Sequence, residues 1–255
     1  MKMRVCGALL MLLMACKSKT ETPPAVAPAK PQKLQPLERV RPDPDSGAAV
    51  GDTRFEIAPF APRGPAAPTE VQTVLLKGDA GPVTLEGDKP VLLKPDGETY
   101  LAQVLPLLAQ LDDAHRTVYL GDATQAFAFQ LVLRDEAAFQ AWVDEPTPGK
   151  LRIVQRADGF ELQTNMGKLP GADPNGPSVP NRGGLDLPTL QKGLLSIKGR
   201  FTEAPDVCFM PTYGTTLADI ARGLQANFTD AEHPIFEKLC LVYPRPAAAD
   251  SGGGR

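Results

Sequence analysis

Proline is the residue that most limits where this chain can fold. Eleven of its 27 prolines lie between residues 17 and 70, mixed with alanine and charged residues. Proline fixes φ and removes a backbone donor, so this density favours extended chain over helices or sheet ladders. Residues 16–70 are therefore predicted to form a disordered tether, and the glycine-rich residues 247–255 a disordered tail. An apolar island at residues 55–60 is expected to dock on the protein's own domain or on a partner.

The first sixteen residues predict where the protein works. Lys2 and Arg4 form a basic start, residues 5–14 are an apolar run without charge, and the run ends in Leu-Met-Ala-Cys. This order is typical of a secretory signal, and the run is about half the ~20 residues that a spanning helix needs. The ending resembles the lipobox of bacterial lipoproteins. We expect residues 1–15 to be removed and Cys16 to be acylated; an ordinary cleaved signal with a chance cysteine is the alternative.

Acylation of Cys16 would anchor the chain to a bacterial membrane, facing the periplasm. Several acyl chains hold a protein firmly, whereas a single chain binds marginally. Lys17 stands where an inner-membrane retention signal usually carries aspartate, so the outer membrane is favoured. The formal net charge is −3, so no nucleic-acid partner is expected.

Cys208 and Cys240 are the two cysteines of the predicted folded region, since Cys6 lies in the signal. An even pair in an oxidising compartment predicts a disulfide, with two buried free thiols as the alternative. No zinc site is expected, because the two histidines, His115 and His233, form no ligand spacing with a cysteine.

Hydrophobic periodicity predicts alternating strands and helices between the tether and the tail. An Asp-Gly turn between two alternating runs, residues 151–155 and 160–163, predicts a hairpin. Other strands are expected at residues 73–76, 83–85, 91–93, 118–120, 127–133, 207–210 and 239–243. Helices are expected at residues 101–111, 137–143, 187–201 and 217–228, and an exposed loop at 165–184. The fold class is therefore predicted to be α+β, with open sheets and helices packed on one face.

A weak internal repeat links the two halves of this region. Residues 91–95 and 99–104 match residues 207–211 and 215–220, and both copies continue through a helix into a strand. We therefore expect two related units containing strand–helix–strand segments, at residues 71–148 and 149–246. A chance match between two similar segments is the alternative.

Four segments of the C-terminal half carry a resemblance to a known family. They are RADGF at 156–160, LDLPTLQKGLLSIKGRF at 185–201, PDVCFMPTYGTTLADIARGL at 205–224 and the closing FEKLCLVYP. Together they are similar to the periplasmic domain of the ExbD/TolR family of biopolymer-transport proteins. The resemblance implies a dimerising domain that contacts envelope proteins or peptidoglycan at the end of a flexible tether.

The start of the chain departs from that family. Its members begin with a transmembrane helix that bears an aspartate used in proton-driven work, whereas this chain is expected to begin with a cleavable signal. We therefore expect an accessory of a transport system and not its proton-coupled subunit. Sheet edges and amphipathic helices are frequent docking elements. The candidate partner-binding residues are Leu239, Leu241 and Tyr243 on the final strand, and Thr216 and Asp219 on the last helix.

The sequence contains no catalytic or nucleotide-binding motif of a common class. A non-enzymatic protein without cofactor or metal is expected, with His115 and His233 at the surface. Trp142 and Phe139 could stack on a sugar ring, but core packing is favoured. The main alternative function is a solute-binding lipoprotein with a ligand pocket between its two halves. A hydrolase of envelope polymers, with carboxylates or a Ser–His pair converging in a cleft, is the third possibility.

Overall fold

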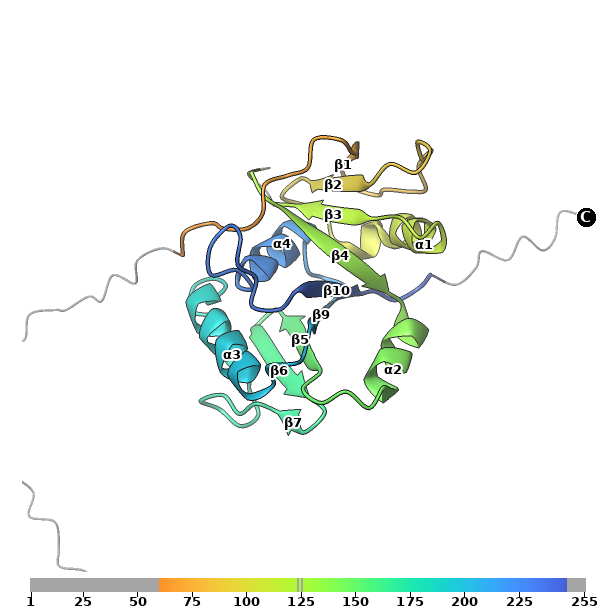
Figure 1. The fold of residues 1–255 in the computed structure, drawn as a ribbon. Coiled ribbons are helices and arrows are strands. Elements are labelled where there is room, and N and C mark those ends of the chain that lie inside the picture. Colours follow the sequence, from red (N-terminus) through yellow and green to blue (C-terminus); the bar gives the residue numbers. More distant parts are fainter. Residues whose placement is uncertain (1–59, 123, 125, 247–255) are drawn as a thin grey trace, which may run out of the picture. The chain divides into compact units, whose positions relative to one another are not determined.

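A ten-stranded mixed β-sheet runs through the part of the chain that the computed structural model describes, residues 60–122, 124 and 126–246 (Figure 1). The strands are β1 (Gln72–Leu76), β2 (Val91–Pro95), β3 (Val118–Gly121), β4 (Ala128–Arg134), β5 (Leu151–Arg156), β6 (Gly159–Thr164), β7 (Gly167–Lys168), β8 (Val179–Pro180), β9 (Asp206–Pro211) and β10 (Lys238–Val242). The helices are the 3-10 turn η1 (Leu101–Gln103) and α1 (Leu105–Asp113), α2 (Glu136–Asp144), α3 (Leu187–Arg200) and α4 (Leu217–Gln225).

Both halves of the chain contribute to this one sheet. The strand order is β1-β2-β3-β4-β10-β9-β5-β6-β7, with β8 paired to β6. The mixed α/β character agrees with the predicted fold class. The expectation of more than one open sheet is wrong, because β4 of the first half pairs with β3 on one side and with β10 on the other, so that one sheet forms.

Helices cover both faces of the sheet, and the expectation of one covered face is therefore also wrong. Side chains of α1, α3 and α4 join the main core, together with Val207 and Phe209 of β9. Cys208 and Met210 alternate with these residues and point to the other face, where they pack with Trp142 of α2. Because α2 follows β4 on that face, its apolar residues form a second, smaller core.

Two groups of three parallel strands share the same register. In each group the middle strand pairs with one strand that precedes it and one that follows a helix. The partners at one level are Gln72, Val91 and Val118 in the first group, and Leu151, Val207 and Leu239 in the second. The residues that the internal repeat matches therefore occupy matching positions in β2 and β9.

The two groups meet through reciprocal hydrogen bonds at matched residues. The Leu101 amide donates to the Thr215 carbonyl at 3.0 Å, and the Leu217 amide donates to the Thr99 carbonyl at 2.9 Å. The groups run in opposite directions, because β3 is antiparallel to β4 whereas β10 is parallel to it. This arrangement approximates a two-fold relation, with β4 between the two groups.

Residues 60–70 are held against the sheet, although the proline pattern predicts a tether there. Phe60 packs against the core, and the Arg63 guanidinium donates to the Thr229 carbonyl at 2.8 Å. Proline lacks a donor but keeps its carbonyl, and the Pro65 carbonyl accepts from the Ala128 amide at 3.0 Å. The rest of the apolar island, residues 55–59, lies outside the described residues, as do residues 16–54 of the tether and the tail.

The connections also differ from the predicted pattern at two places. Residues 83–85 form no strand, because the Gln110 side chain of α1 satisfies both backbone groups of Val83, at 2.8 and 2.7 Å. The predicted loop 165–184 contains the short strands β7 and β8. Pro106 lies in the first turn of α1, where its missing donor costs nothing.

Candidate partner-binding site

The final strand, predicted as a docking edge, lies inside the sheet. β10 pairs with β4 on one side and β9 on the other, and Leu239, Leu241 and Tyr243 are buried. The β10 backbone therefore cannot receive a partner strand, and the prediction of this strand as a docking edge is wrong. Tyr243 and Leu239 still line the two cavities described below. The order of the strands is the physical reason, since β4 occupies the edge that the sequence left open.

The predicted contact residues of α4 stabilise their own helix. The Thr216 hydroxyl accepts from the Asp219 amide at 3.1 Å and so caps the first turn. The Asp219 carboxylate pairs with Arg222 at 3.2 Å. Seven of the nine residues of α4 are buried, so little of this helix is left for a partner.

A cleft of about 190 Å³ opens at the carboxyl ends of β9 and β10. β9 leads into α4 on one face of the sheet, whereas β4 leads into α2 on the other face. On the two sides of β10 the chain therefore leaves the sheet toward opposite faces. Open α/β sheets usually bind ligands at such a position. The lining residues are Leu101, Glu136, Met210, Pro211, Tyr213, Val242, Tyr243 and Pro244.

The lining of this carboxyl-end cleft is mainly apolar and aromatic. Tyr213 is 61% exposed, and Tyr100, which precedes the lining residue Leu101, is 45% exposed. Exposed tyrosines combine a large apolar ring with a polar tip and are enriched in protein interfaces. Glu136 supplies the one carboxylate of the lining.

A hydrogen-bonded network fixes one wall of the carboxyl-end cleft. The Tyr243 hydroxyl donates to the Asp112 carboxylate at 2.7 Å, and burial together with this hydrogen bond raises the pKa of Tyr243 above its usual value. Arg245 pairs with Asp113 at 2.7 Å and with Asp135 at 2.9 Å. The end of β10 is thus tied to α1 and to the start of α2, and the Tyr243 phenol stays neutral.

The volume of the carboxyl-end cleft indicates what it can hold. Small-molecule pockets usually measure about 300–1,000 Å³, whereas this cleft measures about 190 Å³. It is open at the surface beside Tyr213 and is better suited to an apolar side chain of a partner than to a whole solute. Sequence reasoning missed Met210, Tyr213 and Glu136, although their position at or just after the carboxyl end of a strand is a signal that could have found them.

A larger groove lies between residues of both halves, at the other end of β10. It measures about 580 Å³ and is lined by Pro65, Ala66, Gln130, Phe228, Ala231, Glu232, Pro234, Glu237 and Leu239. Its volume falls in the range of solute pockets. The charged groups of its lining, Glu232 and Glu237, are both acidic.

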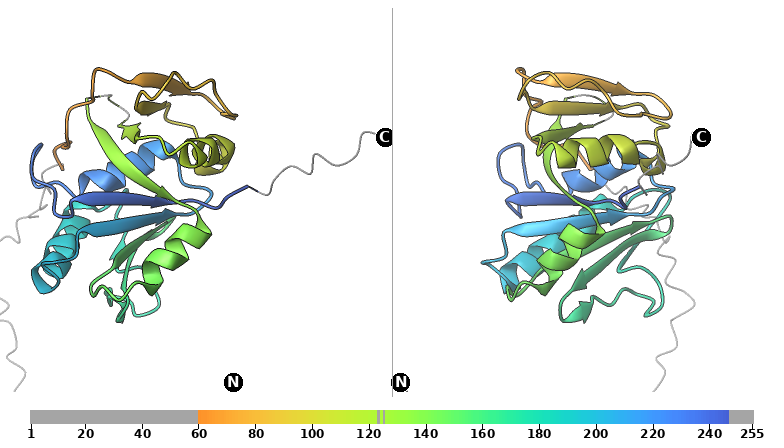
Figure 2. Two further views of the ribbon diagram at one scale, coloured as in Figure 1. Left: turned by 45° about the vertical axis from the view of Figure 1, so that its right-hand side comes forward. Right: turned by 90° about the vertical axis from the view of Figure 1, so that its right-hand side faces the viewer.

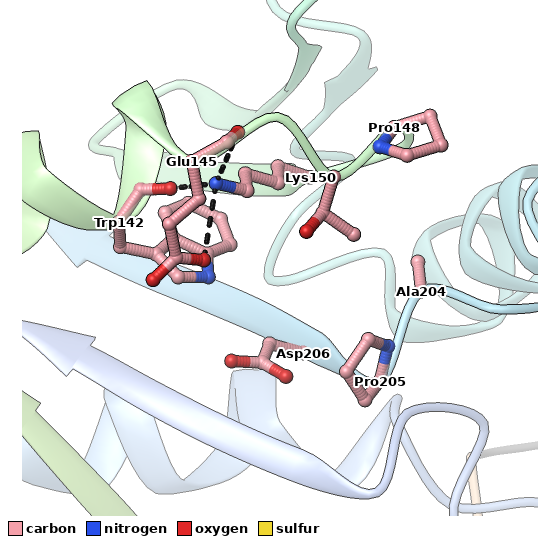
Figure 3. A pocket seen from close by; sticks show the side chains of 8 residues that line it. Trp142, Glu145, Pro148, Lys150, Ala204, Pro205 and Asp206 are labelled. Carbon is pink, nitrogen blue, oxygen red and sulfur yellow. Dashed lines mark hydrogen bonds and ion pairs between the residues drawn. The ribbon is translucent and has the colours of Figure 1, made fainter.

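The cavity beside Trp142 is lined by side chains that hold the end of α2 in place (Figure 3). The buried Lys150 ammonium donates to the carbonyls of Trp142 and Glu145, and so caps the last turn of α2. Arg134 and Lys150 both lie over the Trp142 ring, at 5.0 and 5.3 Å from its centroid. The space left is about 50 Å³. The expectation that Trp142 packs in a core is confirmed, and the ring offers no free face to a sugar.

The predicted disulfide is present in the structure. Cys208 and Cys240 are bonded, and they lie directly opposite each other on β9 and β10. Their sulfurs belong to the smaller core beneath α2. His115 and His233 are both exposed, as expected, and neither lines the carboxyl-end cleft.

In residues 60–122, 124 and 126–246, no three or more His, Cys, Asp or Glu side chains gather as a metal site would require. Within the same residues, no helix has the length and apolarity needed to cross a bilayer. Cys16 lies outside this part of the chain. No family model, curated protein or solved structure matches the chain.

Proposed function

We propose that this protein is a non-enzymatic envelope lipoprotein that binds a partner protein and serves as an accessory of a biopolymer-transport system. In this proposal, acylated Cys16 holds the chain at the membrane, and two ExbD/TolR-like units project into the periplasm. The observation that carries the proposal is the apolar carboxyl-end cleft beside Tyr213.

The lining of this cleft favours a protein over peptidoglycan as the partner. Its walls are formed by Met210, Val242, prolines and tyrosine rings, with a single carboxylate. Apolar and aromatic anchors of this kind bind hydrophobic side chains of other proteins. A glycan–peptide polymer would instead require many hydrogen-bonding groups, so peptidoglycan is the less favoured partner.

The proposal of two related units is supported by their strand registers. The repeat seen in the sequence falls on strands with the same neighbours and the same pairing. The hydrogen bonds that join Leu101 to Thr215 and Leu217 to Thr99 relate matched residues in a reciprocal way. Reciprocal contacts are what a two-fold interface between copies produces, so we infer that one chain holds the equivalent of a dimer.

Site-specific photocrosslinking in intact cells tests the partner-binding surface. A benzophenone amino acid would replace Tyr213 in one strain and Met166 in another, since Met166 is 81% exposed on the turn between β6 and β7. We expect a discrete protein adduct from position 213 and none from position 166. Adducts from neither position, or equally from both, would refute the cleft as the partner site. Recovery of peptidoglycan alone from position 213 would assign the cleft to that polymer.

A matched pair of substitutions then measures the contribution of the aromatic ring. Tyr213→Ala should lower partner recovery at least tenfold, as expected for an anchor worth about 2 kcal/mol. Met166→Ala should leave recovery unchanged. Both residues are exposed, so unfolding midpoints close to the wild-type value would exclude misfolding as the cause.

Lipidation requires its own test, because Cys16 lies outside the described residues. Growth with labelled palmitate should label the wild-type chain and leave Cys16→Ser unlabelled. Labelling of the Cys16→Ser variant would show that the acyl chain is attached elsewhere or that the signal is cleaved differently.

Solute binding is the second candidate function, favoured by the volume of the groove near Leu239. Its acidic residues, Glu232 and Glu237, would select a cationic solute. A cationic solute at 100 times its Kd would stabilise the fold by about 2.7 kcal/mol. Thermal unfolding with periplasmic amines and cationic peptides should then show a raised Tm that Glu237→Gln reduces. Unchanged Tm values across such a panel would count against this function.

A further inference from the structure

The two ends of the sheet are built differently. At one end β6 carries β7 and β8, which are two residues long, and β8 ends in Pro180. At the other end lies β1, a regular strand of five residues that pairs only with β2 within the described residues (Figure 2). Proteins usually protect edge strands by shortening, proline, bulges or inward charges. The β7–β8 end is protected in this way, and β1 is not.

The backbone of β1 offers a row of outward-facing groups. The Gln72 amide donates to the Pro90 carbonyl, and the Leu76 carbonyl accepts from the Asp96 amide, so these residues face β2. Backbone groups alternate in direction along a strand, so those of Thr73 and Leu75 face away from the sheet. The Leu75 side chain is also 65% exposed. A strand with outward-facing backbone groups and an exposed leucine offers a docking edge.

The second strand group shows what fits beside such a strand. β5 has the same register with β9 that β1 has with β2. β5 is covered on its outer side by β6, which pairs with it in the antiparallel direction. The corresponding position beside β1 is vacant among the described strands. The internal comparison therefore points to an antiparallel strand as the occupant.

The charges at the ends of β1 favour a second copy of the same chain. Glu70 precedes the strand and Lys77 follows it, and both are exposed. Antiparallel self-pairing places the acidic end of one strand beside the basic end of the other. We propose that β1 pairs with β1 of a second copy around a two-fold axis at Val74, which joins two sheets into one.

In this register the outward-facing backbone groups of the two β1 strands pair with each other. With Val74 opposite Val74 of the second copy, Thr73 pairs with Leu75 and Leu75 with Thr73, each through outward backbone groups. Val71 and Lys77 then pair at the two ends. The proposal goes beyond the proposed function, in which one chain holds the equivalent of a dimer. Its residues are separate from the carboxyl-end cleft, so either proposal can fail without the other.

Self-crosslinking of the full chain tests this register. Val74 of one copy faces Val74 of the second copy in a non-hydrogen-bonded pair. The Cα atoms of such a pair lie about 4.5 Å apart, which is within the range that a disulfide spans. Val74→Cys should therefore give a covalent dimer on a non-reducing gel of isolated envelopes. Leu195→Cys on α3, where the leucine is 46% exposed, should not. Absence of the Val74→Cys dimer, or equal dimer from both variants, would overturn the proposal.

A charge swap separates a second copy from any other occupant. In sedimentation of the detergent-solubilised full chain at low salt, Glu70→Lys should raise the dimer dissociation constant roughly threefold, as surface ion pairs allow. The same change is expected for Lys77→Glu, and the double variant should regain the wild-type constant. Leu75→Glu should yield monomers, and Leu195→Glu should not. A monomeric wild type, or a double variant weaker than both single variants, would exclude self-pairing and assign the edge to a different strand.

Failure of this inference and failure of the proposed function are distinguishable. Leu75→Glu should abolish the dimer and leave the photocrosslink at position 213 unchanged, because β1 contributes no residue to the carboxyl-end cleft. Loss of both signals in that variant, with an unchanged unfolding midpoint, would show instead that partner binding and self-pairing use one surface.

Discussion

The two strand groups share one framework and differ in what surrounds it. β1, β2 and β3 have the same register as β5, β9 and β10. The second group is enclosed by β6, α2 and α3, and a disulfide joins its strands. The first group keeps an open edge and places Leu92 and Tyr119 at the positions of the two cysteines. The added elements thus enclose the outer strand of the second group, whereas β1 of the first group remains an edge among the described strands.

The largest effect should come from truncating matched core residues, Leu93 in β2 and Phe209 in β9. Both side chains are almost fully buried. Leu93→Ala should lower the free energy of unfolding by about 3 kcal/mol and Phe209→Ala by about 4 kcal/mol. Because both groups belong to one sheet, each variant should unfold in a single transition. Urea denaturation followed by circular dichroism and tyrosine fluorescence provides the measurement.

Two separated transitions in either variant would contradict a shared sheet. They would show that the halves fold independently and that the β4–β10 pairing is weak. The exposed pair Tyr100→Ala and Tyr213→Ala serves as the control, since exposed substitutions usually change stability by less than about 0.5 kcal/mol.

The disulfide should have the next largest effect. Cys208 and Cys240 are separated by 32 residues in sequence, and closing a loop of that length stabilises a fold by about 3.7 kcal/mol. The double variant Cys208→Ser with Cys240→Ser should lose about this amount in urea denaturation. A loss below about 1 kcal/mol would show that strand packing alone holds β9 against β10.

The strand–helix–strand segments could be predicted from local sequence. The Asp-Gly turn fixed the β5–β6 hairpin, and apolar spacing located α3 and α4 within a few residues. For these elements the signal lies within about fifteen residues, the range over which periodicity operates. The disulfide was predicted differently, because an even pair of cysteines remains in a compartment expected to be oxidising.

The order of the strands could not be predicted in the same way. Whether β10 is an edge depends on β4, which is more than 100 residues away in the chain. The cleft has the same origin, since Leu101, Glu136 and Tyr213 come together only when β4 pairs with β10. The placement of α2 on the opposite face followed from that pairing too. The wrong prediction for β10 and the missed residues of the cleft therefore have the same cause, which is pairing between strands that are far apart in the sequence.

The caps of α2 and α3 should show a smaller effect, and that of the α2 cap should depend on pH. Asp135 accepts from the Ala138 amide and pairs with Arg245, and these contacts lower its pKa. Asp186 accepts from the Thr189 amide in a similar cap. Asp135→Ala and Asp186→Ala should each cost about 1 kcal/mol at neutral pH.

The sign of the pH dependence follows from the lowered pKa of Asp135. A carboxyl whose pKa is lower in the folded state stabilises the fold above its unfolded pKa, and this contribution is lost as the pH falls through the folded value. The difference between wild type and Asp135→Ala should therefore shrink as the pH falls below about 4. Urea midpoints measured from pH 7 to pH 2 would show this. A difference that grew in acid would mean that Arg245 does not stabilise the charged form.

The smallest effect should distinguish two residues at matched positions, Leu75 in β1 and Val154 in β5. Each pairs with the penultimate residue of a neighbouring strand. β5 has a neighbouring strand on both sides, whereas β1 has a neighbouring strand on one side among the described residues. Val154→Ala should cost about 1 kcal/mol because its side chain is half-buried between neighbours. Leu75→Ala should change the free energy of unfolding by less than about 0.5 kcal/mol in dilute monomer. Leu75→Ala could instead lower the free energy of unfolding as much as Val154→Ala does, and by more at higher protein concentration. That result would show that β1 is covered in solution by another copy of the chain.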